Sequence, residues 1–311
     1  MSVAIIAEDF AGMRAQATGL AERAGLNWSF HAVRRRGLWA RLPFRHAPFP
    51  LRSIAPIVLP PETAAILSVG GTGGVAGLAV ARRHGLPAFQ IQHPRMRLDR
   101  FDLIVANVHD AISGPNVMSS RNAMHGVTPE RLAAARAAWD ERLRQPGRRL
   151  VSVLVGGANG RFRFGVEEAR EMGRGLARLA REGGATLAVT PSRRTAPAAL
   201  AVLREELAGI EAFVWDGAGE NPYLGLLACA DLIVATCDSV SMVSEAVATS
   251  APVLVADLPG RSRRIGAFVA TLEAAGRVRR FAGHWEDWPV SPLDDTPIAA
   301  GELRRRLGDR L

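Results

Sequence analysis

Hydroxyl and carboxyl side chains gather in residues 236–245, directly after an apolar run. The valines of this segment recur at helical spacing, which places Ser241, Ser244 and Glu245 on a separate polar stripe. A helix N-terminus with hydroxyls such as Ser239 suits a diphosphate, and a carboxylate one turn further in suits a ribose diol. The alternative is an ordinary solvent-exposed helix glutamate. The segment predicts a nucleotide site with Glu245 on the ribose.

Two glycine-rich segments also follow apolar runs and precede helical patterns. Glycines before a helix allow an anionic group to approach the backbone closely, although a purely structural tight turn is the alternative. Arg161 and Arg163, and further along Ser192 and Arg193, add phosphate donors or are simply solvated. The candidate ligand-facing residues of the two segments are Gly71, Thr72, Gly73 and Gly74, and Gly156, Gly157 and Asn159.

A general base for a sugar or lipid hydroxyl can come from the end of the first apolar run or from a histidine loop. Glu8 and Asp9 follow that run, and we favour Asp9. His93, in Gln92-His93-Pro94-Arg95, is the second candidate catalytic residue. For each of these side chains a non-catalytic role is the alternative. The spacing of histidines, cysteines and acids indicates no metal site, and we expect no cofactor.

Composition excludes several classes of enzyme. All 39 basic residues are arginines, so a P-loop lysine, a Schiff base and a Tyr-Lys proton relay are impossible. The net charge of +9 favours anionic ligands. Neither a signal peptide nor an 18-residue apolar run is present, and the two cysteines form no disulfide framework. We therefore expect a cytoplasmic protein whose membrane contact, if any, is peripheral and on the inner membrane.

Arginines alternate with Trp, Leu and Phe between Arg34 and Arg52. This mixture suits an anionic membrane surface, with rings at the headgroup level and cations on acidic lipid. RNA binding by stacking and a packed surface loop are the alternatives. Because the remaining arginines are scattered rather than aligned on one face, we expect no nucleic-acid partner.

Short apolar runs followed by helical patterns must position all of these side chains, and they predict parallel βα units. The stretch Gln-Pro-Gly-Arg-Arg at 145–149 separates two series of runs. We expect an α/β protein of two Rossmann-like domains, residues 1–146 and 147–311, with a closing C-terminal helix in the second. The runs lie at 3–7, 28–33, 64–69, 88–92 and 103–106, and at 150–155, 186–189, 212–215, 232–235 and 253–256.

The ordered motifs of this chain resemble those of the mitochondrial-fission (plant elongated-mitochondria) protein family, which has bacterial members. Beyond the two glycine-rich segments, the histidine loop and the serine-rich segment ending in Glu245, they include Gly114-Pro115-Asn116-Val117 and Asn221-Pro222-Tyr223. The layout is more distantly similar to GT-B glycosyltransferases. The resemblance to the mitochondrial-fission family spans nearly the whole chain.

The second resemblance implies two Rossmann-like domains facing a cleft, with a nucleoside diphosphate sugar on the C-terminal half and an acceptor on the N-terminal half. By it, Glu245 holds the ribose, Gly156, Gly157, Ser239 and Ser241 hold the diphosphate, and the backbone near Trp215 holds the base. We expect a metal-independent glycosyltransferase acting on a lipid-linked or cell-envelope acceptor at the cytosolic membrane face. The alternative is a non-catalytic, membrane-associated adaptor that keeps the fold.

Overall fold

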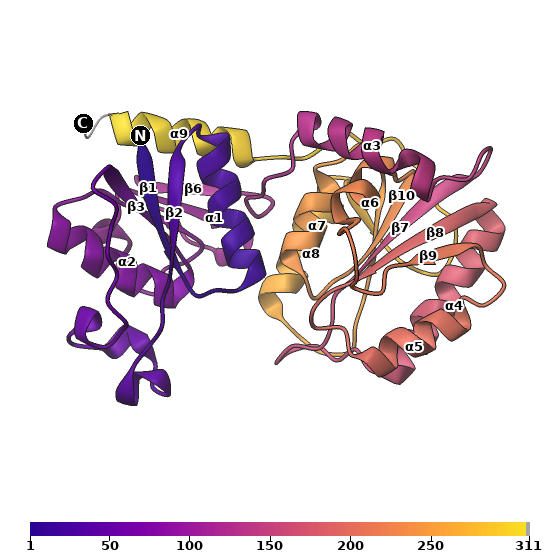
Figure 1. Cartoon of the computed structure of the whole chain (residues 1–311), viewed down its shortest axis with the longest axis horizontal. Coiled ribbons are helices and arrows are strands. Elements are labelled where there is room, and N and C mark those ends of the chain that lie inside the picture. The colour runs from indigo at the N-terminus through magenta and orange to yellow at the C-terminus, as the bar shows by residue number, and fades with distance from the viewer. Residues whose placement is uncertain (309–311) are drawn as a thin grey trace. The chain divides into compact units, whose positions relative to one another are not determined.

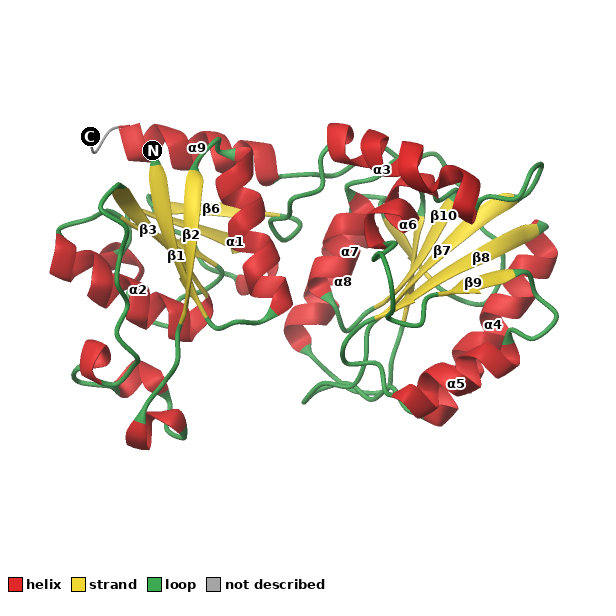
Figure 2. Ribbon diagram, in the orientation of Figure 1, coloured by secondary structure: helices red, strands yellow, loops and turns green. Residues whose placement is uncertain are grey.

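The computed structural model of the chain describes residues 1–308 and divides into two compact units. One unit comprises Met1–Gly126 together with the C-terminal segment that begins at Asp295, and the other comprises Val127–Asp294. Each unit contains a sheet of six parallel strands with helices packed against it (Figures 1 and 2). The α/β class predicted from the apolar runs is confirmed.

The sheet of the first unit has the order β2-β1-β3-β4-β5-β6. Its central strands are buried on both faces, as expected for a parallel sheet covered by helices. The strands are β1 (Ser2–Ala7), β2 (Asn27–Ala32), β3 (Thr63–Val69), β4 (Ala88–Ile91), β5 (Leu103–Asn107) and β6 (Val117–Ser120). The helices are α1 (Ala11–Arg23), α2 (Gly70–His84) and α9 (Thr296–Gly308), with the short 3-10 turns η1 (Gly37–Ala40), η2 (Phe44–His46), η3 (Pro50–Arg52), η4 (Leu98–Arg100) and η5 (Val108–Asp110).

The sheet of the second unit has the order β12-β11-β10-β7-β8-β9. Its strands are β7 (Arg149–Val155), β8 (Ala185–Pro191), β9 (Ala212–Val214), β10 (Leu232–Thr236), β11 (Val253–Ala256) and β12 (Val278–Arg280). The helices are α3 (Pro129–Leu143), α4 (Val166–Gly183), α5 (Pro197–Glu206), α6 (Tyr223–Cys229), α7 (Val240–Val247) and α8 (Arg263–Ala274). Among residues 1–308, every helix is too short or too polar to span a bilayer.

The units divide after Gly126 rather than after Pro146, because helix α3 packs in the second unit. A Cβ at Gly225 of α6 would lie 2.4 Å from the Trp139 ring of α3, so the two helices touch closely. The C-terminal helix α9 differs from expectation as well. It packs on α1 and places Leu303 and Leu307 in the core of the first unit, which it therefore closes in place of the second.

Candidate functional site

The glycine-rich segment of the first unit forms the start of α2 instead of an open ligand loop. A Cβ at Gly73 would lie 2.7 Å from the carbonyl oxygen of Ile6, and one at Gly74 would lie 3.0 Å from Oε1 of Gln90. Gly73 and Gly74 are buried, while Gly71 and Thr72 are partly accessible. These two buried glycines let α2 approach β1 and β4, which is a packing role, and the ligand-facing role of Gly71, Thr72, Gly73 and Gly74 stays a prediction.

The histidine loop that follows β4 has an unusual backbone. Gln92 and Arg95 adopt φ of 68° and 62°, a region that residues other than glycine rarely occupy. The Arg95 backbone N–H donates to Nδ1 of His93 at 3.0 Å. A neutral His93 ring must then carry its proton on Nε2, which makes that nitrogen a donor. This hydrogen bond disfavours His93 as the general base.

Asp9 follows β1 and lies in contact with one cation. The Arg14 guanidinium donates twice to Oδ1 of Asp9, at 2.8 and 3.1 Å, and itself stacks 3.7 Å from the Phe30 ring centroid. Oδ2 of Asp9 accepts no hydrogen bond from the residues that the structure describes, and the carboxyl group is exposed. Asp9 is thus held in place at one oxygen and accessible at the other.

In the second unit, a buried carboxylate joins the loops that follow β7, β8 and β10. The Asp238 side chain is fully buried and accepts hydrogen bonds from the Thr236 hydroxyl at 2.7 Å and from the Gly157 N–H at 3.1 Å. The Arg194 guanidinium forms an ion pair with it at 2.7 Å and also donates to the Gly157 carbonyl at 2.8 Å. A buried charge needs such partners to offset its lost hydration.

This network explains the two glycines of the second glycine-rich segment. A Cβ at Gly156 would lie 2.1 Å from Oδ1 of Asp238, and one at Gly157 would lie 2.2 Å from the Arg194 carbonyl oxygen. The Gly156 N–H donates to the Thr236 hydroxyl at 2.8 Å, and the Gly157 N–H is taken by Asp238. The predicted diphosphate contacts of Gly156 and Gly157 are therefore already used inside the protein.

Some of the other predicted residues of these loops hold the loop structure through hydrogen bonds, and others have side chains that form no ion pair within residues 1–308. Oδ1 of Asn159 accepts from the Arg161 and Phe162 N–H groups at 2.9 and 3.0 Å and shapes a turn. The Ser192 hydroxyl accepts from the Arg194 N–H at 3.2 Å. Arg161 and Arg193 are exposed, and within residues 1–308 their side chains form no ion pair. These two arginines remain available for an anionic ligand.

Helix α7 begins at the predicted place. Ser239 is its N-cap and accepts from the Met242 N–H at 3.4 Å, while Val243 and Val247 face the core. Ser244 is also buried, so the predicted polar stripe is reduced to Ser241 and Glu245.

Glu245 has a partner that the sequence alone did not indicate. Tyr223, the first residue of α6, donates its hydroxyl to Oε2 of Glu245. Burial raises the pKa of Glu245 to about 7, with opposing contributions from Tyr223 and from the positive charge of Arg131. Burial and the neighbouring Glu245 hold the pKa of Tyr223 well above its ordinary value, so its hydroxyl stays a donor. In the sequence, the one feature that singled out Tyr223 was the Asn221-Pro222-Tyr223 motif, in a chain with a single tyrosine.

Trp215 borders a small cavity beside the end of β9. The cavity has a volume of about 250 Å³ and is walled by Trp139, Arg142, Trp215, Gly219 and Glu220, among others. Nε1 of Trp215 donates to the Ala218 carbonyl at 2.8 Å, which fixes the indole. Arg142 lies 3.7 Å from the Trp139 ring centroid and pairs with Glu220 at 2.8 Å. Aromatic walls with a few polar groups suit a flat heterocycle.

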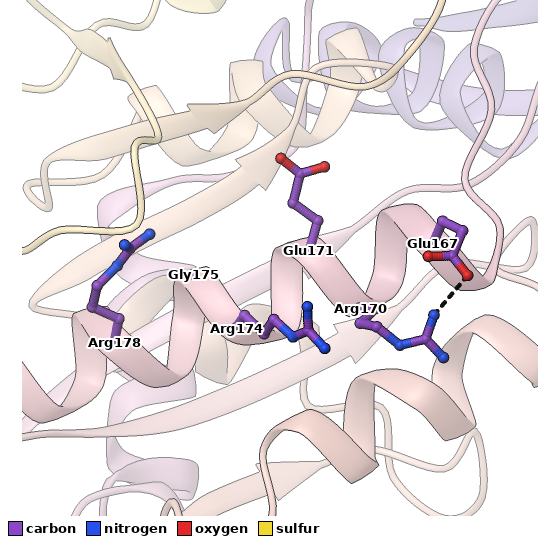
Figure 3. A pocket seen from close by; sticks show the side chains of 6 residues that line it. All are labelled: Glu167, Arg170, Glu171, Arg174, Gly175 and Arg178. Carbon is purple, nitrogen blue, oxygen red and sulfur yellow. Dashed lines mark hydrogen bonds and ion pairs between the residues drawn. The ribbon is translucent and has the colours of Figure 1, made fainter.

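A second hollow, of about 550 Å³, lies along α4 (Figure 3). All six lining residues belong to that helix, and Arg170 is bonded to Glu167 at 2.6 Å. None of the predicted site residues lines this hollow. We attribute it to the spacing of long charged side chains on an exposed helix face.

The adjacent arginines 193 and 194 provide a matched test of the Asp238 network. Arg194→Gln should lower the free energy of unfolding by about 2–4 kcal/mol, because it leaves a buried carboxylate without its cation. Arg193→Gln should stay within about 0.5 kcal/mol of the wild type, as expected for an exposed side chain. Urea unfolding of both variants measures the difference, and equal losses would contradict this description of the network.

Comparison with known proteins places the chain in a family. The family model described as Mitochondrial fission ELM1 matches residues 11–307. Mitochondrial fission protein ELM1 of Arabidopsis thaliana is 31% identical over 248 residues, which cover 71% of this chain and 58% of that protein. The chain therefore spans less than two thirds of the length of that relative.

Two solved structures share the fold at low sequence identity. UDP-GlcNAc 2-epimerase from Neisseria meningitidis, bound to UDP-GlcNAc, has a TM-score of 0.55 and 12% identity, covering 99% of this chain and 100% of that chain. MurG of Acinetobacter baumannii has a TM-score of 0.51 and 15% identity, covering 99% and 92%. They show a GT-B-like fold of two Rossmann-like units, and the sequence match shows that the chain belongs to the Mitochondrial fission ELM1 family.

Proposed function

We propose that this protein binds a nucleoside diphosphate sugar through its second unit and transfers the sugar to a lipid-linked or cell-envelope acceptor at the cytosolic face of a membrane. The observation that carries the proposal is the placement of Glu245. Its carboxyl group lies one turn inside α7, with Oε2 fixed by Tyr223. Oε1 accepts no hydrogen bond from the other described residues, which leaves it as the acceptor for a ribose diol.

The rest of the nucleotide can be assigned around Glu245. The cavity beside Trp215 supplies aromatic walls for the base. Since the Gly156 and Gly157 amides are occupied, the diphosphate falls to the first turn of α7, where Ser241 lies, and to Arg161 and Arg193. A fold neighbour was solved bound to UDP-GlcNAc, which makes UDP sugars the first ligands to test.

The transfer itself requires a base on the acceptor side, and Asp9 fits this role better than His93. In an inverting displacement, the acceptor oxygen forms a bond to the anomeric carbon while the bond from that carbon to the diphosphate oxygen breaks. Oδ2 of Asp9 takes the acceptor's hydroxyl proton. The leaving diphosphate keeps the electron pair, and helix-terminal amides and arginines stabilise its charge.

A surface of the first unit supports the membrane part of the proposal. Residues 23–61 contain no Asp or Glu but seven arginines. Leu38, Phe49 and Val58 are 67%, 63% and 81% exposed in this stretch. Its short turns η1–η3 stand away from the sheet of their own unit (Figure 2). Exposed apolar side chains among arginines suit the headgroup region of an anionic bilayer.

The same surface supports a second candidate, a non-catalytic adaptor at a membrane. Family membership favours this function, because the Arabidopsis relative is named as a mitochondrial fission protein. An adaptor needs the membrane surface but does not need a nucleotide at Glu245. Nucleotide binding therefore separates the two candidates.

Nucleotide binding should be measured by thermal shift and calorimetry with UDP, GDP, ADP and UDP-GlcNAc. One base should raise the melting temperature of the wild type, since a ligand specific for the folded state stabilises it. Glu245→Gln keeps a partner for Tyr223 but removes the charge, and should weaken binding by about tenfold. Glu171→Gln, an exposed glutamate on α4, is the control. If no nucleotide binds, the transferase is rejected and the adaptor is retained.

Membrane binding should be measured by sedimentation with vesicles of neutral lipid alone or with added phosphatidylglycerol. The wild type should bind only the anionic vesicles. Arg36→Gln/Arg41→Gln should reduce binding by at least about tenfold, at roughly 1 kcal/mol for each arginine near the surface. Arg82→Gln/Arg83→Gln, which removes two exposed charges from α2, should leave binding unchanged. Equal losses of vesicle binding in both variants would indicate that the net charge of the protein attracts the membrane and that this surface has no special role.

A further inference from the structure

Two loops at the carboxyl edge of the second sheet pair with each other as a short antiparallel ribbon. Phe162, in the loop after β7, forms an antiparallel bridge with Gly260, in the loop after β11. The Arg163 N–H donates to the Pro259 carbonyl at 2.9 Å, and the Arg261 N–H donates to the Arg161 carbonyl at 3.2 Å. We call residues 161–163 and 259–261 the arginine ribbon.

The ribbon depends on Gly260. Its φ is 145°, and a Cβ there would lie 2.1 Å from the Arg161 carbonyl oxygen. No other residue permits this approach without moving the backbone. The positions of the two loops relative to each other are therefore fixed.

Alternation along the ribbon places its arginines on one face. Successive side chains of an extended strand point to opposite faces, and Phe162 is buried. Arg161 and Arg163 therefore share the face away from the core, and Arg261 stands directly opposite Arg161. Like charges at directly opposed positions of an antiparallel pair are destabilising. Folding alone gives no reason for this pairing.

Three acidic side chains near the ribbon are engaged with other groups. Asp257 pairs with Arg280, Glu168 accepts from the Gly165 N–H at 2.8 Å, and Asp238 pairs with Arg194. This face carries four exposed arginines, Arg161, Arg163, Arg261 and Arg263, whose side chains form neither an ion pair nor a hydrogen bond within residues 1–308. Among residues 1–308, no carboxylate forms an ion pair with these four arginines.

The start of α8, directly after the ribbon, adds a second electrostatic mismatch. Ser262 is the N-cap and accepts from the Ile265 N–H at 3.4 Å. The first turn contains Arg263 and Arg264 and no acid. Helix N-termini carry partial positive charge and favour acidic residues, so the exposed Arg263 there is unfavourable in the absence of an anion.

We propose that the arginine ribbon and the first turn of α8 bind a compact anionic group, a phosphate or a carboxylate, in addition to the nucleotide diphosphate. Arg163, Arg261 and Arg263 are its main ligands, and Arg161 is shared with the proposed diphosphate site. An anion here removes the repulsion between Arg161 and Arg261 and complements the α8 terminus. This inference rests on the proposed function, and it means that either the donor sugar or the acceptor carries an acidic group.

The first test measures, without a ligand, how much the unpaired positive charges of the ribbon and of the α8 N-terminus lower the melting temperature. Arg261→Gln/Arg263→Gln should raise the melting temperature by about 2 °C at low salt, because it removes both repulsions. Added salt should reduce the difference. Arg181→Gln/Arg204→Gln removes two exposed arginines from α4 and its C-terminal neighbour α5 and should give no rise. An unchanged or lower melting temperature in the first variant would overturn the electrostatic premise.

The second test measures binding by calorimetry, with inorganic phosphate as the probe. The wild type and Arg181→Gln/Arg204→Gln should bind phosphate with equal affinity, and Arg261→Gln/Arg263→Gln should bind it at least about tenfold more weakly. Absence of phosphate binding by the wild type, or equal binding by all three proteins, would overturn the site.

The same proteins then identify the source of the acidic group. UDP-glucose and UDP-glucuronate differ only in the carboxylate of the sugar. A preference of about tenfold for UDP-glucuronate in the wild type, lost in Arg261→Gln/Arg263→Gln, assigns the group to the donor. If the wild type binds UDP-glucose and UDP-glucuronate equally and still binds phosphate, the acidic group belongs to the acceptor. Phosphate binding without any nucleotide binding supports the site and rejects the proposed donor function.

Discussion

The arrangement of the second unit depends on one buried charge, the carboxylate of Asp238. Because a buried carboxylate must be paired, it recruits the Thr236 hydroxyl, the Gly157 amide and the Arg194 guanidinium, and so joins three loops. The cost is that amides and one arginine in positions suited to a phosphate are no longer available. Under the proposed function, ligand recognition therefore relies on α7, on Glu245 and on the arginines that Asp238 leaves unpaired.

Both units use the same five residues at the start of a buried strand. The pentapeptide Asp-Leu-Ile-Val-Ala occurs at 102–106 and at 231–235. Oδ2 of Asp102 accepts the Ala88 N–H at 2.8 Å, and Oδ2 of Asp231 accepts the Leu150 N–H at 2.8 Å. In each unit the aspartate precedes a buried strand and satisfies an amide of the strand beside it. The repeated sequence therefore reflects a shared local role in each sheet, while the loops at the carboxyl edges differ in chemistry.

Apolar runs were sufficient to predict the buried strands, because a strand covered on both faces needs an uninterrupted apolar sequence. The edge strands β6 and β12 escaped prediction, since Val-Met-Ser-Ser and Val-Arg-Arg are short and partly exposed. The glycines that follow a strand predicted the start of a helix or a loop, but the sequence did not indicate that Gly73 and Gly156 make room for the protein's own atoms. The Tyr223–Glu245 bond joins two helices, and no spacing in the sequence encodes it.

Because Tyr223 is the only tyrosine, a carbon-13 label at its ζ carbon gives a single NMR resonance that reports on Glu245. The resonance should titrate with an inflection near pH 7 that follows Glu245 and disappears in Glu245→Gln. A bound nucleotide sugar should shift the resonance and lower the inflection, since hydrogen bonds from the ribose diol favour the ionised carboxylate. A resonance unmoved by every nucleotide sugar, with the inflection unchanged, would contradict the assignment of Glu245 as the ribose ligand.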